Sequence, residues 1–253
     1  MSAWAFALIV FAAQLIGWAV GRLVRRRLPP EHLDTRTRDS VMLLVGMVAT
    51  LSALVLGLMI STAKTSFDAD KASVIEIAAD ILLIDHALAQ YGDESKAARE
   101  LLRGFTKGAV DGVFSPDEAG QALDVTAAPL PQMGRLQQSL LALSPATDAQ
   151  RWLQARALTL SSELKRARVL FAERASGSIP PAFLFVLTAW LAMLYIALAI
   201  FAPSNLTSTL TAVGGALAFS AAIFLILELD TPFHGLISLS SEPLVKTLEL
   251  LGR

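Results

Sequence analysis

Two acids and an aromatic residue gather in one short stretch near the carboxyl end of the chain. Glu228 and Asp230 end a long apolar run in the sequence ILELDTPFHG, and Pro232 and Phe233 follow them directly. This stretch could form a polar site, or it could mark the place where a membrane helix ends. Acids are unfavourable at the carboxyl end of a helix, which prefers cations. We therefore expect a basic partner for them, either Lys64 or a residue of a neighbouring subunit.

The other reactive side chains argue against catalysis. The chain has no cysteine, and His32, His86 and His234 lie in three different regions. The sequence also contains no nucleophile elbow, zinc-protease helix, glycine-rich phosphate loop or calcium-binding loop. We therefore predict a protein that is not an enzyme and that has neither a metal site nor a cofactor.

Glu76 and Asp80 form a second acidic pair. They are four residues apart, which places them on one face of a helix. Such a pair could bind a cation. More often it forms a solvated face or pairs with bases of the next helix, here Arg99 or Arg103, and we favour this second interpretation.

The composition indicates an all-α integral membrane protein. Of the 253 residues, 54% are hydrophobic and 17% are charged, whereas about a quarter are charged in soluble proteins. Crossing a bilayer takes roughly 20 apolar residues in a helix. Four segments meet this requirement, namely 3–21, 41–61, 182–202 and 206–227. The net charge of −1 gives no indication of nucleic-acid binding.

The region between the second and third spans is polar and has a helical pattern. Phe67, Val74, Ile81 and Leu88 repeat every seven residues, and no helix breaker occurs before Gly92. The second membrane helix should therefore continue beyond the bilayer. This predicts four parts: 1–61 with two spans and an arginine-rich loop, an inserted helical extramembrane domain at 62–180, a two-span hairpin at 181–229, and a junction with an amphipathic helix at 230–253.

Small residues recur along one face of the second span. They are Gly46, Thr50, Ala53, Gly57 and Ser61, at intervals of three or four residues. Small residues let membrane helices approach closely, and they also leave room for a pathway lined by hydroxyl groups. We give the two interpretations equal weight. A homo-oligomer with this helix near its symmetry axis would satisfy both.

Gln14 is the only strongly polar side chain within the first span. A polar group in lipid is costly and is expected to find a partner. We expect an interhelical hydrogen bond here rather than a role in transport.

The arginines favour one orientation in the membrane. Short loops rich in basic residues stay in the cytoplasm, and six arginines follow the first span: Arg22, Arg25, Arg26, Arg27, Arg36 and Arg38. This predicts that the extramembrane domain lies in the periplasm of a bacterial inner membrane.

The chain resembles the bestrophin-like family of bacterial and plant membrane proteins. The resemblance rests on LPPEHLDTRTRDSVMLLVGMVATLSALVLGLMISTAKTSFD and on LELDTPFHGLISLSSEPL, with signatures at 61–68 and 229–235. It implies an oligomeric channel for small ions, anions in the bestrophins, with the second helix lining the pore. That helix has no aromatic residue between 41 and 61, so Phe67 is the candidate constriction. The alternative is a membrane-anchored scaffold or sensor that binds a partner or ligand through its helical domain.

Overall fold

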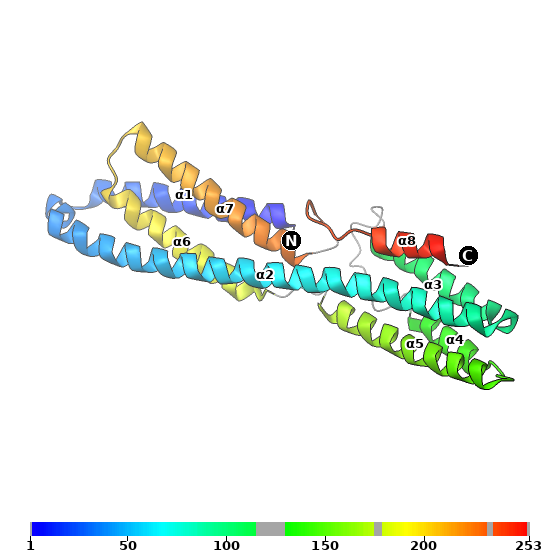
Figure 1. The fold of residues 1–253 in the computed structure, drawn as a ribbon. Helices are drawn as coiled ribbons and strands as arrows, with labels where there is room; N and C mark the ends of the chain where they lie inside the picture. Colours follow the sequence, from blue (N-terminus) through cyan, green and yellow to red (C-terminus); the bar gives the residue numbers. More distant parts are fainter. Residues whose placement is uncertain (1, 115–129, 175–178, 232–234, 252–253) are drawn as a thin grey trace. The chain divides into compact units, whose positions relative to one another are not determined.

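The computed structural model describes all residues except 1, 115–129, 175–178, 232–234 and 252–253 (Figure 1). The described residues form helices joined by short connections, without a β-strand. The α-helices are α1 (Ala3–Arg27), α2 (Thr35–Tyr91), α3 (Lys96–Phe114), α4 (Leu130–Leu141), α5 (Asp148–Arg174), α6 (Pro181–Phe201), α7 (Leu206–Asp230) and α8 (Glu242–Leu250). Two 3-10 turns, Pro30–Leu33 and Asp93–Ser95, precede α2 and α3.

The chain divides into two compact units. Unit 1 comprises residues 1–66 and 177–230, and unit 2 comprises residues 67–176 and 231–253. Helix α2 is 57 residues long and contributes its first part to unit 1 and its remainder to unit 2. It continues without a break to Tyr91, as the sequence predicts, and ends where Gly92 adopts a φ of 118°. A positive φ of this kind favours glycine.

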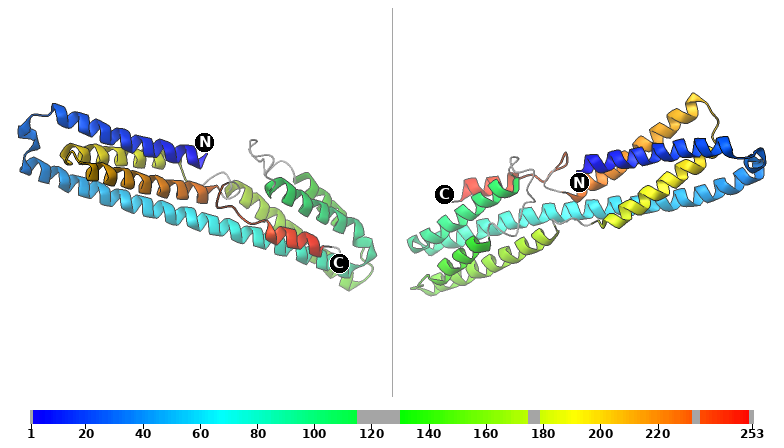
Figure 2. Two further views of the ribbon diagram at one scale, coloured as in Figure 1. Left: turned by 90° about the horizontal axis from the view of Figure 1, so that it is seen from above. Right: turned by 180° about the vertical axis from the view of Figure 1, so that it is seen from behind.

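Unit 1 contains four helices that are long and apolar enough to cross a membrane: α1, the first part of α2, α6 and α7. This confirms the four predicted spans. Helix α1 packs along both α6 and α7 (Figure 2). The α6–α7 hairpin is joined further by the hydroxyl of Tyr195, which donates to the carbonyl oxygen of Ala212 at 3.2 Å. In unit 1, the first helix therefore holds the two arms of the hairpin together.

The predicted arginine-rich loop is much shorter than expected. Four of the six arginines lie in the last two turns of α1, and Arg36 and Arg38 lie in the first turn of α2. Arginine is a good helix former and is favourable at a helix carboxyl end, so α1 continues until Pro29 and Pro30 stop it. Asp34 then begins α2, since its Oδ1 accepts a hydrogen bond from the Thr37 amide at 2.8 Å.

Unit 2 is built around the remainder of α2. The heptad residues Val74, Ile81 and Leu88 are buried in a core shared with α3, α4, α5 and α8, which confirms the predicted seam. The predicted amphipathic helix is α8, and its Leu244 and Leu251 are buried in the same core. The apolar face of this helix is therefore buried within unit 2.

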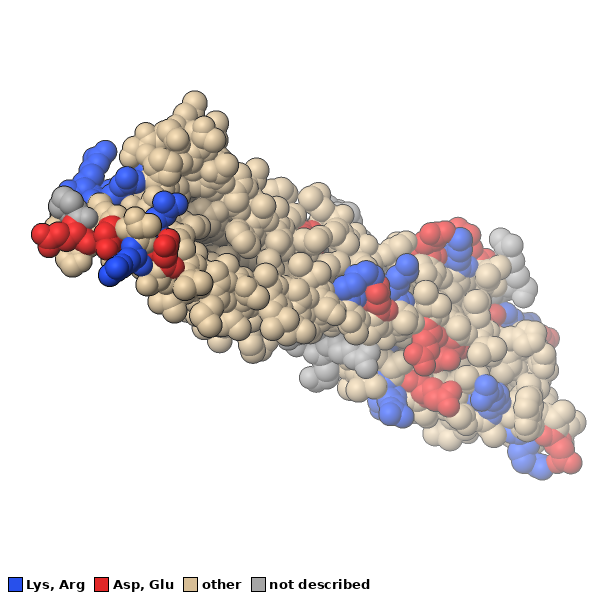
Figure 3. Space-filling view, turned by 60° about the vertical axis from the view of Figure 1, so that its left-hand side comes forward, with Lys and Arg blue, Asp and Glu red and all other residues tan. Residues whose placement is uncertain are grey.

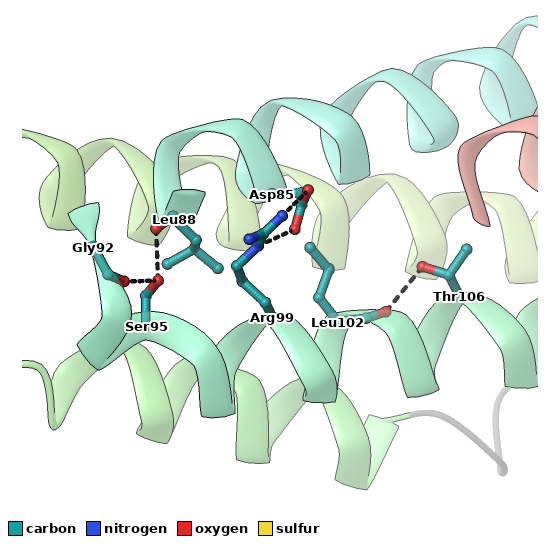
Figure 4. Close-up of polar contacts among 7 residues, drawn as sticks. All are labelled: Asp85, Leu88, Gly92, Ser95, Arg99, Leu102 and Thr106. Carbon is teal, nitrogen blue, oxygen red and sulfur yellow. Dashed lines mark hydrogen bonds and ion pairs between the residues drawn. The ribbon is translucent and has the colours of Figure 1, made fainter. Parts of the chain in front are cut away.

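A buried ion pair joins α2 to α3 within unit 2 (Figure 4). Arg99 donates through Nε to Oδ1 of Asp85 at 2.7 Å and through a terminal nitrogen to Oδ2 at 2.9 Å. This bidentate contact raises the pKa of Arg99. Beside it, the Ser95 hydroxyl donates to the carbonyl oxygens of Leu88 and Gly92, at 2.6 and 2.7 Å, and so satisfies the end of α2.

Of the alternatives considered for Glu76 and Asp80, pairing with Arg99 is wrong, because Arg99 binds Asp85 farther along α2. Glu76 is exposed, as expected of a solvated face. Asp80 lies instead among like charges. Burial, followed by the charges of Glu76 and Glu163, raises the pKa of Asp80, and Arg156 partly opposes them. Within the described part of the chain, no group of three His, Asp or Glu side chains is placed to hold a metal ion.

Replacing Asp80 with asparagine should therefore stabilise the protein at neutral pH. A pKa raised by folding means that the charged carboxylate is disfavoured in the folded state, and this loss of stability grows as pH rises through that pKa. Like charges four residues apart on a helix cost about 0.2–0.5 kcal/mol, which is the gain expected from D80N at pH 7. The gain should vanish below about pH 3, where aspartate is almost fully protonated in both states.

Thermal unfolding of the wild type and D80N at both pH values measures this difference. The matched control is D111N, which removes a charge from an exposed position on α3. Equal gains from both substitutions would attribute the effect to net charge rather than to the neighbours of Asp80.

Candidate functional site

The predicted small-residue stripe lies on the surface of unit 1. Gly46, Thr50, Ala53, Gly57 and Ser61 are all exposed on α2. A Cβ atom built on Gly46 or Gly57 would have no described heavy atom within 4 Å outside its own helix. The stripe therefore does not pack against the other described helices of its own chain. It is available to another subunit or to an aqueous path.

The chemistry of the stripe is that of small, weakly polar groups. The Thr50 hydroxyl donates its proton to the carbonyl oxygen of Gly46 at 2.8 Å. Its oxygen can still accept a hydrogen bond, but the hydroxyl has no second proton to donate. Large exposed side chains, among them Leu44 and Leu51, occupy another face of the same helix. The side of α2 turned into unit 1 carries Ser52, Met59 and Ala63, all of which are buried.

The predicted constriction residue, Phe67, lies elsewhere. It belongs to unit 2, where it is half-buried and packs against the apolar core around α2. The stripe residues belong to unit 1 and are exposed. A constriction formed by this side chain stays a prediction.

The acidic junction lies inside a helix, one turn beyond the predicted end of the fourth span. Helix α7 extends to Asp230, so Glu228 and Asp230 occupy its last turn. Glu228 is buried and Asp230 is half-buried, whereas Lys64 on α2 is exposed. Neither acid is fully solvated, which agrees with the expectation that both have specific partners. That Lys64 is this partner stays a prediction. Pro232 and Phe233, the other members of the predicted junction, lie outside the described residues.

Gln14 does not make the interhelical hydrogen bond expected of it. It is fully buried, and neither its Nε2 nor its Oε1 has a hydrogen-bond partner among the described residues. It lies on the face of α1 that also buries Ala7, Val10, Gly17 and Gly21.

The closest helix packing involves two glycines that the sequence reasoning missed. A Cβ atom on Gly17 would lie 2.7 Å from the carbonyl oxygen of Ala192, and one on Gly21 would overlap the carbonyl oxygen of Ile196. These glycines form the pattern GWAVG within an apolar segment, which is typical of close helix pairs in membranes. This pattern was visible in the sequence, and the structure places the tight interface at it on α1 rather than at the stripe on α2.

The arginine-bearing end of α1 is fixed to the end of α6. Arg22 donates to the carbonyl oxygens of Ala202 and Pro203 at 3.4 and 3.2 Å, and Arg25 donates to that of Ala202. The Arg22 guanidinium also lies 5.6 Å from the ring centre of Trp18. Unpaired carbonyl groups end every helix, so these two arginines satisfy the carboxyl end of α6 and oppose its negative dipole.

Comparisons with solved structures support the membrane fold. A crystal structure of a membrane protein aligns over 99% of both chains with a TM-score of 0.65 and 13% identity. Two point-substituted structures of a bacterial bestrophin homologue from Klebsiella pneumoniae align with TM-scores of 0.65 and 0.67, each at 14% identity. They cover 97% and 99% of this chain, and 95% and 97% of theirs. At these identities the similarity establishes the fold.

The family follows from the sequence itself. No curated protein matches the chain. The family model for the bestrophin-like domain, however, matches residues 12–244, which is nearly the whole length and includes all or part of each membrane-spanning helix. The chain therefore belongs to the bestrophin-like domain family.

Proposed function

We propose that this protein is a homo-oligomeric, channel-like membrane protein that conducts small ions, with α2 lining the path. The observation that carries the proposal is the exposed stripe of small residues on α2, which has no packing partner at Gly46 or Gly57 within the described chain. Membership of the bestrophin-like family supports it. Anions are the proposed ions because two of the similar solved structures are of a bestrophin homologue, and the resemblance to bestrophins implies anions.

Several copies of the chain are needed for such a path. The described residues of unit 1 provide four candidate spans, and α1 packs closely against α6 and α7. That packing leaves one side of α2 exposed along the whole predicted membrane segment. Copies arranged with this side toward a common axis would enclose a path bordered by small residues.

We further propose the arrangement in the membrane. Unit 2 would be the extramembrane domain inserted between the second and third spans, on the periplasmic side of a bacterial inner membrane, and the arginine-bearing end of unit 1 would be cytoplasmic. The wild-type chain has no cysteine, so single cysteines introduced at Lys96 and Glu31 report each side without background. Labelling of the Lys96 position only from the cytoplasm would reverse the orientation.

A bulky residue in the stripe should block conduction. We expect A53F to lower the current of purified protein in planar bilayers by about tenfold, because apolar rings narrow and dewet a path. The matched control is L51F, at an exposed position on another face of α2. Size-exclusion chromatography should give the same oligomer for both variants, so that loss of current is separated from loss of assembly.

Two results would contradict the channel. One is wild-type protein that carries no current at any tested pH, calcium concentration or voltage. The other is a monomer or dimer in which α2 packs shut. Either result would favour the alternative, a membrane-anchored scaffold or sensor whose helical unit 2 binds a partner or ligand.

A further inference from the structure

Unit 1 contains an apolar cavity that the proposed ion path does not use. It has a volume of about 490 Å³, within the usual range of ligand cavities, which is about 300–1,000 Å³. Four helices line it, with Trp18 from α1, Val45 and Ala49 from α2, Leu194 from α6 and Phe219 from α7 among the lining residues. An apolar space of this size between membrane helices suits a hydrocarbon chain.

Two hydroxyl groups that line the cavity are already hydrogen-bonded to backbone carbonyl groups. The Tyr195 hydroxyl donates to Ala212, and the Thr211 hydroxyl donates to the carbonyl oxygens of Thr207 and Ser208 at 3.0 and 3.1 Å. Tyr195, Ala212, Thr211 and Ser208 all line the cavity. A polar ligand would therefore find few free donors among these walls, whereas an acyl chain needs none.

One end of the cavity is cationic. Arg38 lines it and is exposed, and its guanidinium makes no hydrogen bond or ion pair with any residue that the structure describes. Ala202 and Pro203 line the same cavity, and their carbonyl oxygens bind Arg22 and Arg25. Figure 3 shows basic and acidic side chains gathered at the end of unit 1 where α1 joins α2, beside a wide surface without charged residues. This is the arrangement expected where a membrane helix bundle meets phospholipid head groups.

We propose that this cavity binds an anionic phospholipid, with one acyl chain between the helices and its phosphate on Arg38. An apolar interior with a basic rim matches an anionic amphiphile, and basic pockets between membrane helices are typical lipid head-group sites. A free inorganic anion would leave the apolar walls unfilled. The site borders α2 on the side of Val45, a different face from the exposed stripe, so it does not depend on ion conduction.

Native mass spectrometry of the full-length protein tests the site. Purified protein is stripped of lipid in detergent and then offered phosphatidylglycerol and phosphatidylcholine in equal amounts. We expect one phosphatidylglycerol retained per chain, in preference to phosphatidylcholine by about fivefold, the effect of one basic residue near a membrane surface. R38Q should remove this preference, whereas R36Q, which removes an exposed arginine that does not line the cavity, should keep it.

A second pair of variants tests the acyl-chain position. V45W places a large side chain in the cavity and should lower the retention of either lipid at least about fivefold. L44W places the same side chain at an exposed neighbouring position and should leave retention unchanged. Since Arg38 is exposed, R38Q remains informative even if V45W fails to fold.

Several outcomes would overturn the lipid site. They are equal retention of the two lipids, no lipid retained by the wild type, and R38Q behaving like R36Q. Loss of oligomer mass in V45W with lipid retention unchanged would assign the cavity to a neighbouring subunit instead. Retained phosphatidylglycerol in a protein that carries no current would support the lipid site while contradicting the proposed channel, so the two proposals fail separately.

Discussion

Replacing Gly21 with alanine should destabilise the membrane unit by about 1–3 kcal/mol, the usual cost of inserting one group into a closely packed interior. The new Cβ atom would overlap the carbonyl oxygen of Ile196 and lie 2.7 Å from the Cβ atom of Ala199. Backbone atoms of α6 cannot move aside as a flexible side chain can. Helix α1 must therefore separate from α6, and its contact with α7 should weaken with it.

The matched control is the same substitution on α2. A Cβ atom at Gly46 has open space around it, and alanine favours helix by about 1 kcal/mol over glycine. We therefore expect G46A to be neutral or slightly stabilising in thermal unfolding of the detergent-solubilised protein, and G21A to unfold at a clearly lower temperature. G21A and G46A with the same unfolding temperature would mean that α1 and α6 do not approach as closely as the structure shows.

This pair of glycines also shows what could be predicted from the sequence. The presence of the helices could be predicted from hydropathy and from the spacing of apolar residues alone. Long apolar runs and a heptad repeat are both patterns that few structures other than helices satisfy. Which of the two glycines packs against another helix did not follow, because Gly21 and Gly46 both have a small residue four positions away in the sequence. Only the tertiary arrangement distinguishes them, because Gly21 lies against Ile196 and Gly46 lies on an open surface.

The arginines and acids show the same limit for charged groups. The cluster of arginines was evident in the sequence, but it was predicted to lie in a loop because charged residues and two prolines occur together there. Sequence reasoning also offered Arg99 or Arg103 as partners for Glu76 and Asp80, beside a solvated face, and left the choice open. Which acid on α2 binds Arg99 depends on how α3 is rotated about its axis against α2, and in the structure Arg99 meets Asp85. The spacing of residues along a single helix gives no information about that rotation.

The second large effect concerns this ion pair. We expect D85A to lower the stability of unit 2 by about 2–5 kcal/mol, because removing one partner leaves the other charge poorly solvated. The side chains of Arg99 and Asp85 are only 22% and 11% exposed, and two parallel hydrogen bonds join them. R99A should cost a similar amount, since it leaves the Asp85 carboxylate buried on α2.

The double variant distinguishes an unpaired charge from lost packing. Replacing both partners with apolar residues of similar size is often neutral, so D85L with R99M should recover most of the stability that either single alanine variant loses. Asp93 and Lys96 supply the control, because their ion pair is largely exposed and D93A should change stability little. Chemical denaturation of the wild type, D85L, R99M and the double variant gives the coupling between the two sites. If the double variant loses as much stability as the two single variants together, the two side chains stabilise the α2–α3 contact by packing and not by their charges.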